Sequence, residues 1–422
     1  MLDIKFIREN PEKVKEAMKN RNVEFDVAVL LAVDEKRRAM IKETDDLRAR
    51  QNEFADEIGK LGGEERQGKI EESKKIKIQL ANADEKLKTL EEEFMRLMHQ
   101  IPNIPLTDVP VGRDERDNAV LREVGEKPQF DFEPKDHAEL GEALGVIDFQ
   151  HGAKVAGSGF YYLKNAGVLL ELALVHYALD FLQKKGFTLC TTPDVARKKF
   201  YLATGYLPRG PEAQTYEIAQ SDLGLIATSE VTLAALHAEE ILEESALPLL
   251  YAGYSHCFRQ ESGSYGKYSR GLYRVHQFTK VEMFAYVQPD ESGRIHEDLL
   301  RFEEELWQGL GIPYRVLEMC TADLGAQAAR KYDLEGWMPG RGDWGEITST
   351  SNTTDYQARN LNIRYHKKGG HTGFVHMLNV TAVATSRAIV ALLENYQNED
   401  GSVRVPEALQ KYMGGLKMIQ RL

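Results

Sequence analysis

A long stretch without proline near the N-terminus is the feature that most restricts how this chain can fold. No proline occurs from Asp26 to Met98, and charged residues are dense there. Within this stretch, apolar residues recur at alternating spacings of four and three, in the series Ile76, Leu80, Ala83, Leu87, Leu90, Phe94 and Leu97. Such a heptad seam is typical of a long helix that packs against a second helix.

The second helix can lie in the same chain. Upstream apolar residues are spaced strictly by seven, and Gly62-Gly63 follows them and can reverse the chain; the series is Val33, Met40, Leu47, Phe54 and Leu61. We therefore expect an antiparallel helical hairpin. Its second helix, if about 30 residues long, would extend roughly 45 Å. A coiled coil that joins two copies of the chain would show the same pattern.

Two closely spaced prolines, Pro102 and Pro105, indicate where this helical region ends. Proline terminates helices and stiffens linkers, so we place a domain boundary here, with residues 1–103 as a helical arm and 104–422 as a second domain. The second domain combines expected helices with short strand-like runs at irregular intervals. This pattern favours an α+β fold with an antiparallel sheet. The helices are expected over 167–186 and near 290–310 and 382–396, and strands over 187–189, 225–228, 271–275 and 281–287.

Composition excludes several classes of protein. The chain has 422 residues, of which 42% are hydrophobic and 9% aromatic, which is typical of a globular protein rather than a disordered one. We find no apolar run of about 18 residues that would predict a membrane span, and no N-terminal targeting pattern. The three cysteines, Cys190, Cys257 and Cys320, are odd in number and far apart. A disulfide framework is therefore not expected, and a reducing cytosol fits.

The net charge of −12 argues against a generic nucleic-acid binder. The charge is unevenly spread, because residues 1–100 hold 21 basic and 23 acidic residues and are nearly neutral. Lys74, Lys75 and Lys77 lie within one expected helical turn. A solvated helix face would explain that cluster as well as a binding site would.

Several familiar motifs can be set aside. Gly340, Gly342 and Gly345 match G-x-G-x-x-G, but proline precedes them and a β-like run follows, whereas a dinucleotide loop needs a strand before it and a helix after it. The sequence contains no P-loop and no zinc site of common spacing. His256 beside Cys257 could suggest a thiol nucleophile, although a partly buried cysteine beside an ordinary histidine explains the pair better.

The segment from Cys257 to Glu282 has the strongest chemical pattern. It resembles a strand, a long glycine- and tyrosine-bearing loop, and a returning strand on which alternate residues share one face: Arg274, His276, Phe278, Lys280 and Glu282. Unpaired charges rarely line a core. A nucleotide site would use them, since a guanidinium binds phosphate oxygens and an aromatic ring stacks on a base. A solvated hairpin face is the simpler alternative.

These residues also resemble a known family. Phe-Arg-x-Glu at 258–261 and Arg-Gly-Leu-Tyr-Arg-Val-His-Gln-Phe at 270–278 resemble motif 2 of class II aminoacyl-tRNA synthetases (near 257–284), most closely in the seryl-tRNA synthetases. The resemblance spans nearly the whole chain. Its other parts are the N-terminal tRNA-binding arm of bacterial-type members, motif 1 near 186–195, a serine-binding Thr-x-Glu loop at 228–230, and motif 3 near 346–396.

The resemblance implies a class II catalytic domain, with an antiparallel β-sheet flanked by helices, and a tRNA-binding helical hairpin. It implies a cytoplasmic homodimer without a membrane segment. The expected activity is that of a serine–tRNA ligase. Such an enzyme uses ATP and Mg²⁺ to activate L-serine as seryl-adenylate and transfers serine to the 3′ end of tRNA-Ser, and by extension of tRNA-Sec.

The resemblance also implies a role for each matching residue. For ATP, Arg259 would bridge the α-phosphate and the serine carboxylate, and Glu261 and Phe278 would hold adenine, while Arg274 and Arg387 would bind the outer phosphates. Glu346 and Ser349 would coordinate Mg²⁺. For serine, the residues are Thr228 and Glu230 for the ammonium, Glu282 and Thr381 for the hydroxyl, Asn379, and Arg259. Arg270 is a further candidate for phosphate or the tRNA acceptor end.

Two positions depart from the family pattern. Lys267-Tyr268-Ser269 stands where Arg-Asp-Thr is common, and Val380 stands where glycine is common. Valine adds three carbons and disfavours a positive φ, so Val380 either packs against a neighbour or narrows the serine pocket. A narrowed pocket would suit a paralogue that serves antibiotic biosynthesis or resistance. A third possibility is a non-catalytic RNA-binding or interaction protein. Loss of Arg259, Glu282 or Arg387 would have indicated such a protein, but the sequence retains all three.

Overall fold

The computed structural model describes residues 1–206, 215–261, 271–367 and 369–421. The chain divides into one unit that spans Leu2–Pro102 and a second that comprises Met1 and Asn103–Leu422. The sequence-based boundary, after residue 103, lies one residue beyond this division. The predicted sites Arg270 and Lys267-Tyr268-Ser269 lie outside the described residues.

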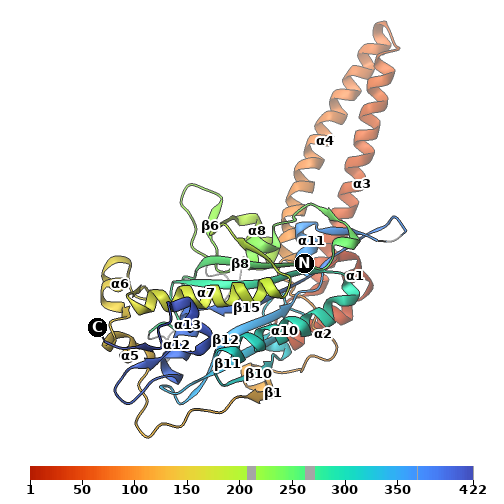
Figure 1. Cartoon of the computed structure of the whole chain (residues 1–422). Coiled ribbons are helices and arrows are strands. Elements are labelled where there is room, and N and C mark those ends of the chain that lie inside the picture. The colour runs from red at the N-terminus through yellow and green to blue at the C-terminus, as the bar shows by residue number, and fades with distance from the viewer. Residues whose placement is uncertain (207–214, 262–270, 368, 422) are drawn as a thin grey trace. The chain divides into compact units, whose positions relative to one another are not determined.

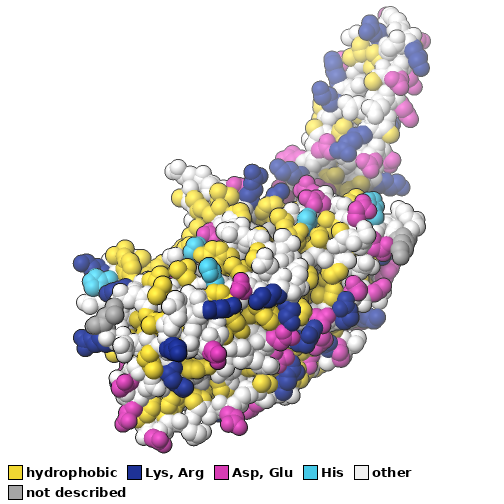
Figure 2. Space-filling model, in the orientation of Figure 1, with side chains coloured by type: hydrophobic (Ala, Val, Ile, Leu, Met, Phe, Trp, Pro, Cys, Tyr) yellow, Lys and Arg dark blue, Asp and Glu magenta, His cyan; other side chains and the backbone are white. Residues whose placement is uncertain are grey.

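The first unit is a helical hairpin preceded by two short helices, as Figure 1 shows. The helices are α1 (Ile4–Glu9), α2 (Pro11–Asn20), α3 (Val27–Ile58) and α4 (Gly63–Met98). The predicted seam forms within one chain, because Leu47 of α3 is buried with Ile76 and Ala83 of α4. Charges of both signs line the surface of the hairpin (Figure 2), and some pair across it, as Arg48 does with Asp84 at 2.7 Å.

The second unit is built on an eight-stranded sheet. Every neighbouring pair of strands is antiparallel except β8 and β4, which are parallel. The predicted α+β class with an antiparallel sheet is therefore confirmed, with one parallel pair at an edge. In spatial order, the strands are β1 (Ala119–Val124), β10 (Tyr314–Glu318), β11 (Arg330–Met338), β12 (Asp343–Asn352), β15 (His376–Ala384), β9 (Gln277–Val287), β8 (Leu249–Phe258) and β4 (Thr188–Thr191).

Three long helices cover one face of this sheet: α7 (Ala166–Lys184), α10 (Ser292–Gly309) and α12 (Thr385–Asn395) (Figure 1). They form the main hydrophobic core with the side chains of one strand face, such as Leu174 and Trp307 against Met283. On the other face, Phe284 and Tyr286 pack in a second cluster, with Leu233 and Leu361. That cluster covers only part of the face. The short helices involved are α8 (Lys198–Thr204), α9 (Glu230–Ala234) and α11 (Tyr356–Leu361).

Smaller elements complete the unit. The helices are α5 (His137–Ala143), α6 (Phe149–Ala156) and α13 (Glu407–Gln410). The short strands are β2 (Ile147–Asp148), β3 (Tyr162–Leu163), β5 (Val195–Arg197), β6 (Leu223–Leu225), β7 (Ile241–Leu242), β13 (Arg364–His366), β14 (Thr372–Phe374), β16 (Val403–Arg404) and β17 (Met418–Ile419).

Two of the predicted strands differ from the structure: one segment is not a strand, and one strand ends earlier than predicted. Residues 271–275 form turns, because Gly271 adopts a φ of +84° and the next backbone N–H, of Leu272, donates to a side chain, His137 Nε2, at 3.1 Å. The predicted strand at 225–228 ends at Leu225. Gly340 and Gly342 lie in the tight connection between β11 and β12, so the rejection of a dinucleotide loop was correct.

Helix α7 is an exception to the expectation that no run is apolar enough to cross a membrane. Among the described helices it alone has the length and composition of a membrane span. A core helix of a soluble protein passes the same test. In α7, 39% of the apolar window is buried, and Leu170, Leu174, Ala178 and Leu182 lie in the main core. The three cysteines are free, as expected.

Candidate active site

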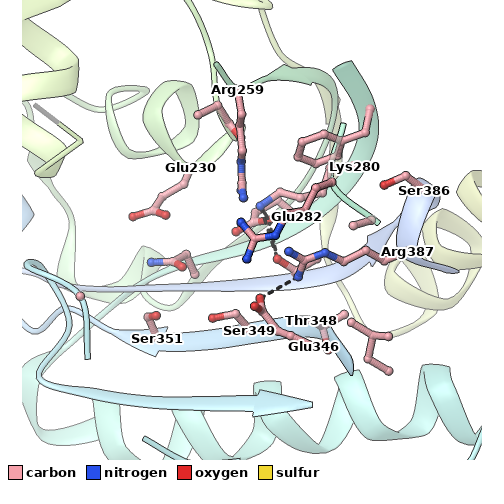
Figure 3. A pocket seen from close by; sticks show the side chains of 18 of the residues that line it. Glu230, Arg259, Lys280, Glu282, Glu346, Thr348, Ser349, Ser351, Ser386 and Arg387 are labelled. Carbon is pink, nitrogen blue, oxygen red and sulfur yellow. Dashed lines mark hydrogen bonds and ion pairs between the residues drawn. The ribbon is translucent and has the colours of Figure 1, made fainter. Parts of the chain in front are cut away.

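A cavity of about 670 Å³ lies over the part of the sheet that α9 and α11 leave uncovered. Its lining includes side chains of β9, β11, β12 and β15, the beginning of α12, and Arg259, which follows β8. Figure 3 shows that charged side chains from these elements converge, with Arg259 facing Glu346 and Arg387 across the cavity. Of the residues predicted to bind ATP, serine or Mg²⁺ that the structure describes, all except Thr228 line this cavity.

Two β-bulges bring the lining residues to one face. On β12, the pairing with β11 skips Ile347, so that Glu346 and Ser349 both line the cavity although they are three residues apart. Regular alternation would place them on opposite faces. A second bulge on β15 lies between Thr381 and Val383, and Ala384 lines the cavity together with Thr381. The functional surface therefore depends on two local irregularities.

One end of the cavity holds the buried carboxylate of Glu230, at the beginning of α9. The Tyr206 hydroxyl donates to Glu230 Oε2 at 2.6 Å, and Gln357 Nε2 donates to Oε1 at 2.7 Å. Burial raises the pKa of the Glu230 carboxyl to about 7, against these hydrogen bonds, which act to lower it. Thr228 does not line the cavity, and its hydroxyl accepts a hydrogen bond from the Glu230 backbone N–H at 3.2 Å.

A second buried carboxylate, Glu282 on β9, has different partners. The Lys280 ammonium contacts Glu282 Oε2, and the Thr381 hydroxyl donates to the same oxygen at 3.4 Å. Thr381 faces Glu282 directly in the antiparallel pairing of β15 with β9. Nearby, the side-chain amide nitrogen of Asn379 is buried without a hydrogen-bond partner among the described residues. An unpaired buried donor at a cavity wall is available to a ligand.

The middle of the cavity is cationic. The Arg259 guanidinium lies 5.2 Å from the centroid of the Phe278 ring, and its Nε donates weakly to the Ala227 carbonyl at 3.4 Å. Beside it, Arg274 Nη1 lies 3.5 Å from Glu261 Oε2. These contacts leave most of the donor capacity of Arg259 for a ligand, since a guanidinium carries five N–H groups.

The far end pairs Arg387 with Glu346. Their Nη1 and Oε1 atoms are 2.8 Å apart, and the Arg387 guanidinium lies over the Tyr273 ring at 5.1 Å. Burial alone would raise the pKa of Glu346, but the charges of Arg387 and Lys331 outweigh it and lower that pKa to about 2. Glu346 is therefore an anionic oxygen donor at neutral pH, and its side chain is still 41% exposed.

Several lining or supporting residues were not predicted from the sequence, and one residue was predicted on the wrong face. His276 does not line the cavity, because it precedes β9, and its Nδ1 lies 2.9 Å from the Arg259 carbonyl oxygen. Lys280 belonged to the alternate residues that were predicted to share one face of the strand, but no function was predicted for it. Tyr206, Gln357 and Lys331 carried no local signal; Gln357 reaches Glu230 from 127 residues away in the sequence.

Val380 lies on the face of β15 opposite Asn379 and Thr381. Its side chain is fully buried in the main core, and it does not line the cavity. It pairs with Met283 of β9 and Thr350 of β12, its two antiparallel neighbours. Of the two alternatives from the sequence, packing against neighbours therefore holds, and narrowing of the cavity does not.

This position gives a first prediction. Val380→Gly should destabilise the protein by about 2–4 kcal/mol, because it removes three buried carbons and places glycine within a strand. The KM for a substrate that binds in the cavity should stay within about twofold, because no cavity contact is lost. Thermal unfolding and steady-state kinetics on the same preparation test both parts. A large change in KM at unchanged stability would contradict this placement.

Comparisons with known proteins agree with this fold. Residues 1–105 match the model of the seryl-tRNA synthetase N-terminal domain, and residues 215–396 match the tRNA synthetase class II core domain (G, H, P, S and T). A serine–tRNA ligase from Rubrobacter xylanophilus is 54% identical over 98% of each chain. One from Dictyoglomus turgidum is 51% identical, again over 98% of each chain.

Solved structures are similar over the full length. The seryl-tRNA synthetase of Pyrococcus horikoshii, solved in complex with ATP, is 43% identical, with a TM-score of 0.89 over all of both chains. The cytoplasmic serine–tRNA ligase of Naegleria fowleri, in complex with AMP, is 36% identical, with a TM-score of 0.84 over 100% of this chain and 99% of that one. The chain belongs to the seryl-tRNA synthetase family, the serine–tRNA ligases among the class II aminoacyl-tRNA synthetases.

Proposed function

We propose that the enzyme uses ATP to convert L-serine to seryl-adenylate in the cavity over β9, β12 and β15, and then transfers serine to the 3′ end of tRNA-Ser. The observation that carries this proposal is a single cavity that holds a buried carboxylate, Glu230, at one end and the guanidinium groups of Arg259 and Arg387 beyond it. Serine offers an ammonium, and both substrates offer anions, so the charges are complementary. The ATP and AMP complexes of two relatives support the nucleotide.

Arg259 is proposed to hold the serine carboxylate and the α-phosphate of ATP together. A carboxylate oxygen attacks the α-phosphorus, an O–P bond forms, and the bond to the bridging oxygen breaks as pyrophosphate leaves with its electron pair. No protein nucleophile is needed. Catalysis then rests on proximity and on neutralising the charge that moves in the transition state. Arg387 and Arg274 bind the outer phosphates, Phe278 stacks on adenine, and Glu261 contacts its amino group.

Mg²⁺ fits the far end of the cavity. Glu346 and Ser349 offer a carboxylate and a hydroxyl, the oxygen donors that this hard cation prefers, and the low pKa of Glu346 keeps its carboxylate charged. When bound there, the ion would neutralise phosphate charge. Arg387, already paired with Glu346, supplies a second fixed positive charge on the same side.

Specificity for serine is proposed to come from Glu282, Thr381 and Asn379. A site that hydrogen-bonds a substrate hydroxyl rejects an analogue without it, because the buried partner is left unpaired. Alanine should therefore be a poor substrate. Threonine has to be excluded by its extra methyl group.

The N-terminal hairpin is the proposed binding arm for tRNA-Ser and, by the same shape-based recognition, tRNA-Sec. Its match to the N-terminal domain of the family supports this assignment. Lys74, Lys75 and Lys77 project from α4, and Lys74 lies 3.2 Å from Glu71, so the local surface mixes charges. Binding through such residues depends on salt concentration. We place the enzyme in the cytosol, where its tRNA substrates and reduced cysteines belong.

A homodimer is proposed to form over α7 and the edge strand β4. Three large apolar side chains of α7 are exposed, with Leu172 at 49%, and Leu189 of β4 is exposed beside an open sheet edge. Figure 2 shows hydrophobic side chains at the surface over this region. An exposed apolar edge invites association, and the motif 1 pattern in the sequence indicates that a second copy of the chain covers it. The other two exposed apolar side chains of α7 are Val168 and Leu169.

Leu172→Glu is therefore expected to convert the dimer to a monomer, because the interface would bury a charge without a partner. Light scattering after size-exclusion chromatography measures the mass. Val111→Glu is the matched control, since Val111 is 70% exposed on a different surface, and this variant should stay dimeric. A Leu172→Glu protein with the wild-type mass would contradict the interface.

ATP–pyrophosphate exchange across the amino acids tests the proposed activation, and charging of tRNA-Ser tests the transfer. Serine should support the fastest exchange. Exchange that is independent of serine, or faster with another amino acid, would overturn the assignment. Activation of serine without charging of tRNA-Ser would instead favour the paralogue that serves antibiotic chemistry or resistance.

A further inference from the structure

The two carboxylates of the proposed serine pocket are equally buried but have unlike partners. Glu230 and Glu282 are each 2% exposed. Glu230 receives hydrogen bonds from two neutral groups, the Tyr206 hydroxyl and the Gln357 amide. Glu282 instead contacts a cation, the Lys280 ammonium. The two sites therefore differ in net charge before any substrate binds.

Lys280 is held in the pocket rather than at its rim. Its side chain is 6% exposed, and it lies two residues from Glu282 on the same face of β9. Its ammonium contacts Glu282 Oε2 and donates to the Thr381 hydroxyl at 3.4 Å. These are the two groups proposed above to bind the serine hydroxyl. Figure 3 shows Lys280 and Glu282 together, with Glu230 apart from them.

The charges determine where an ammonium is most stable. At Glu230 a substrate ammonium meets an unbalanced carboxylate, whereas at Glu282 it meets a carboxylate already paired with Lys280 and suffers repulsion from that lysine. A neutral hydroxyl suffers no such repulsion and can share the carboxylate. Serine has one ammonium and one hydroxyl, so only one of its two orientations satisfies both sites.

We propose that Lys280 is a specificity-determining residue, which neutralises Glu282 and so reserves Glu230 for the α-ammonium and Glu282 for the hydroxyl of serine. This inference rests on the proposed function of the pocket and adds a substrate class that the enzyme excludes. Amino acids with an ammonium in place of the serine hydroxyl, such as L-2,3-diaminopropionate, are rejected by the charge of Lys280 and not by size.

The test compares serine with L-2,3-diaminopropionate in ATP–pyrophosphate exchange. Assays from pH 6 to 8 include conditions in which the side-chain amine is protonated. In Lys280→Met, the ratio of kcat/KM for diaminopropionate to that for serine should rise by at least about 10²-fold, because the like charge is removed and Glu282 is left to pair with the substrate. The gain should be greatest at the acidic end of the range.

Two further variants make the result specific. Lys280→Arg keeps the charge and should keep the ratio near the wild-type value. Lys331→Met removes another cavity lysine, but one that pairs with Asp333 at 3.1 Å, and it should not raise the ratio. The same rise in the ratio is expected for Lys280→Gln. This variant is assayed instead of Lys280→Met if the methionine variant does not fold.

The outcomes separate this inference from the function on which it rests. Wild-type enzyme that does not activate serine would overturn the proposed function. Wild-type enzyme that activates serine, together with a folded Lys280→Met or Lys280→Gln whose ratio is unchanged, would overturn the role of Lys280 alone. An equal rise in Lys331→Met would also overturn it, because loss of any cavity cation would then suffice.

Discussion

Arg259→Ala is expected to lower serine-dependent ATP–pyrophosphate exchange by at least about 10²-fold, the usual cost of removing a charge partner of a transition state. The guanidinium lies at the centre of the cavity, between the carboxylate pocket of Glu230 and the Arg387–Glu346 pair. It is proposed to contact both reacting groups, so its loss affects proximity and charge neutralisation together. The fall should appear mainly in kcat, because the developing charge is greatest in the transition state.

Two arginine variants serve as controls for this result. Arg259→Lys keeps the charge but lacks the planar fork that binds two oxygens, so its activity should lie between wild type and Arg259→Ala. Arg197→Ala removes a guanidinium that is 64% exposed and lies outside the cavity, and its exchange rate should equal that of wild type. Unchanged exchange in a folded Arg259→Ala protein would contradict the proposed role.

Much of the architecture could be predicted from the sequence because its signals are local and periodic. The heptad series around Ile76 predicted α4, and Gly62-Gly63 predicted the reversal before it. The alternation of Phe278, Lys280 and Glu282 on β9 was also correct, since a regular strand enforces it. The predicted alternation failed at His276, which precedes the strand. Residues 271–275 have a strand-like composition, but Gly271 starts a turn there.

The rest of the site depends on contacts that no local pattern encodes. Gln357, on α11, and Tyr206, which follows the end of α8, both support Glu230, and neither belongs to a motif recognised in the sequence. The bulge at Ile347, which turns Glu346 to the side of Ser349, is a property of the pairing between β11 and β12. The net charge of −12 was likewise a poor guide to the partner, because it averages a nearly neutral arm with an acidic catalytic unit.

Glu230→Gln is expected to lower kcat/KM for serine by at least about 30-fold, since loss of one partner from a buried charge pair costs about 2–5 kcal/mol. In the wild-type enzyme, burial raises the pKa of this carboxyl to about 7. Only the ionised form can pair with the serine ammonium. Below pH 7, kcat/KM for serine should therefore fall by about tenfold per pH unit. Glu230→Gln should lack this dependence, which rate measurements from pH 6 to 8 would show.

The stability of the folded enzyme should change with pH in the opposite direction to kcat/KM. Because the pKa of Glu230 is raised in the folded state, folding is favoured while the group is protonated, and this contribution is lost as the pH rises through about 7. Glutamine cannot ionise, so the melting temperature of Glu230→Gln at pH 8 should equal or exceed that of wild type. Reduced use of serine together with undiminished stability cannot result from misfolding. A variant that retains the serine KM and the pH profile of wild type would show that the α-ammonium binds elsewhere.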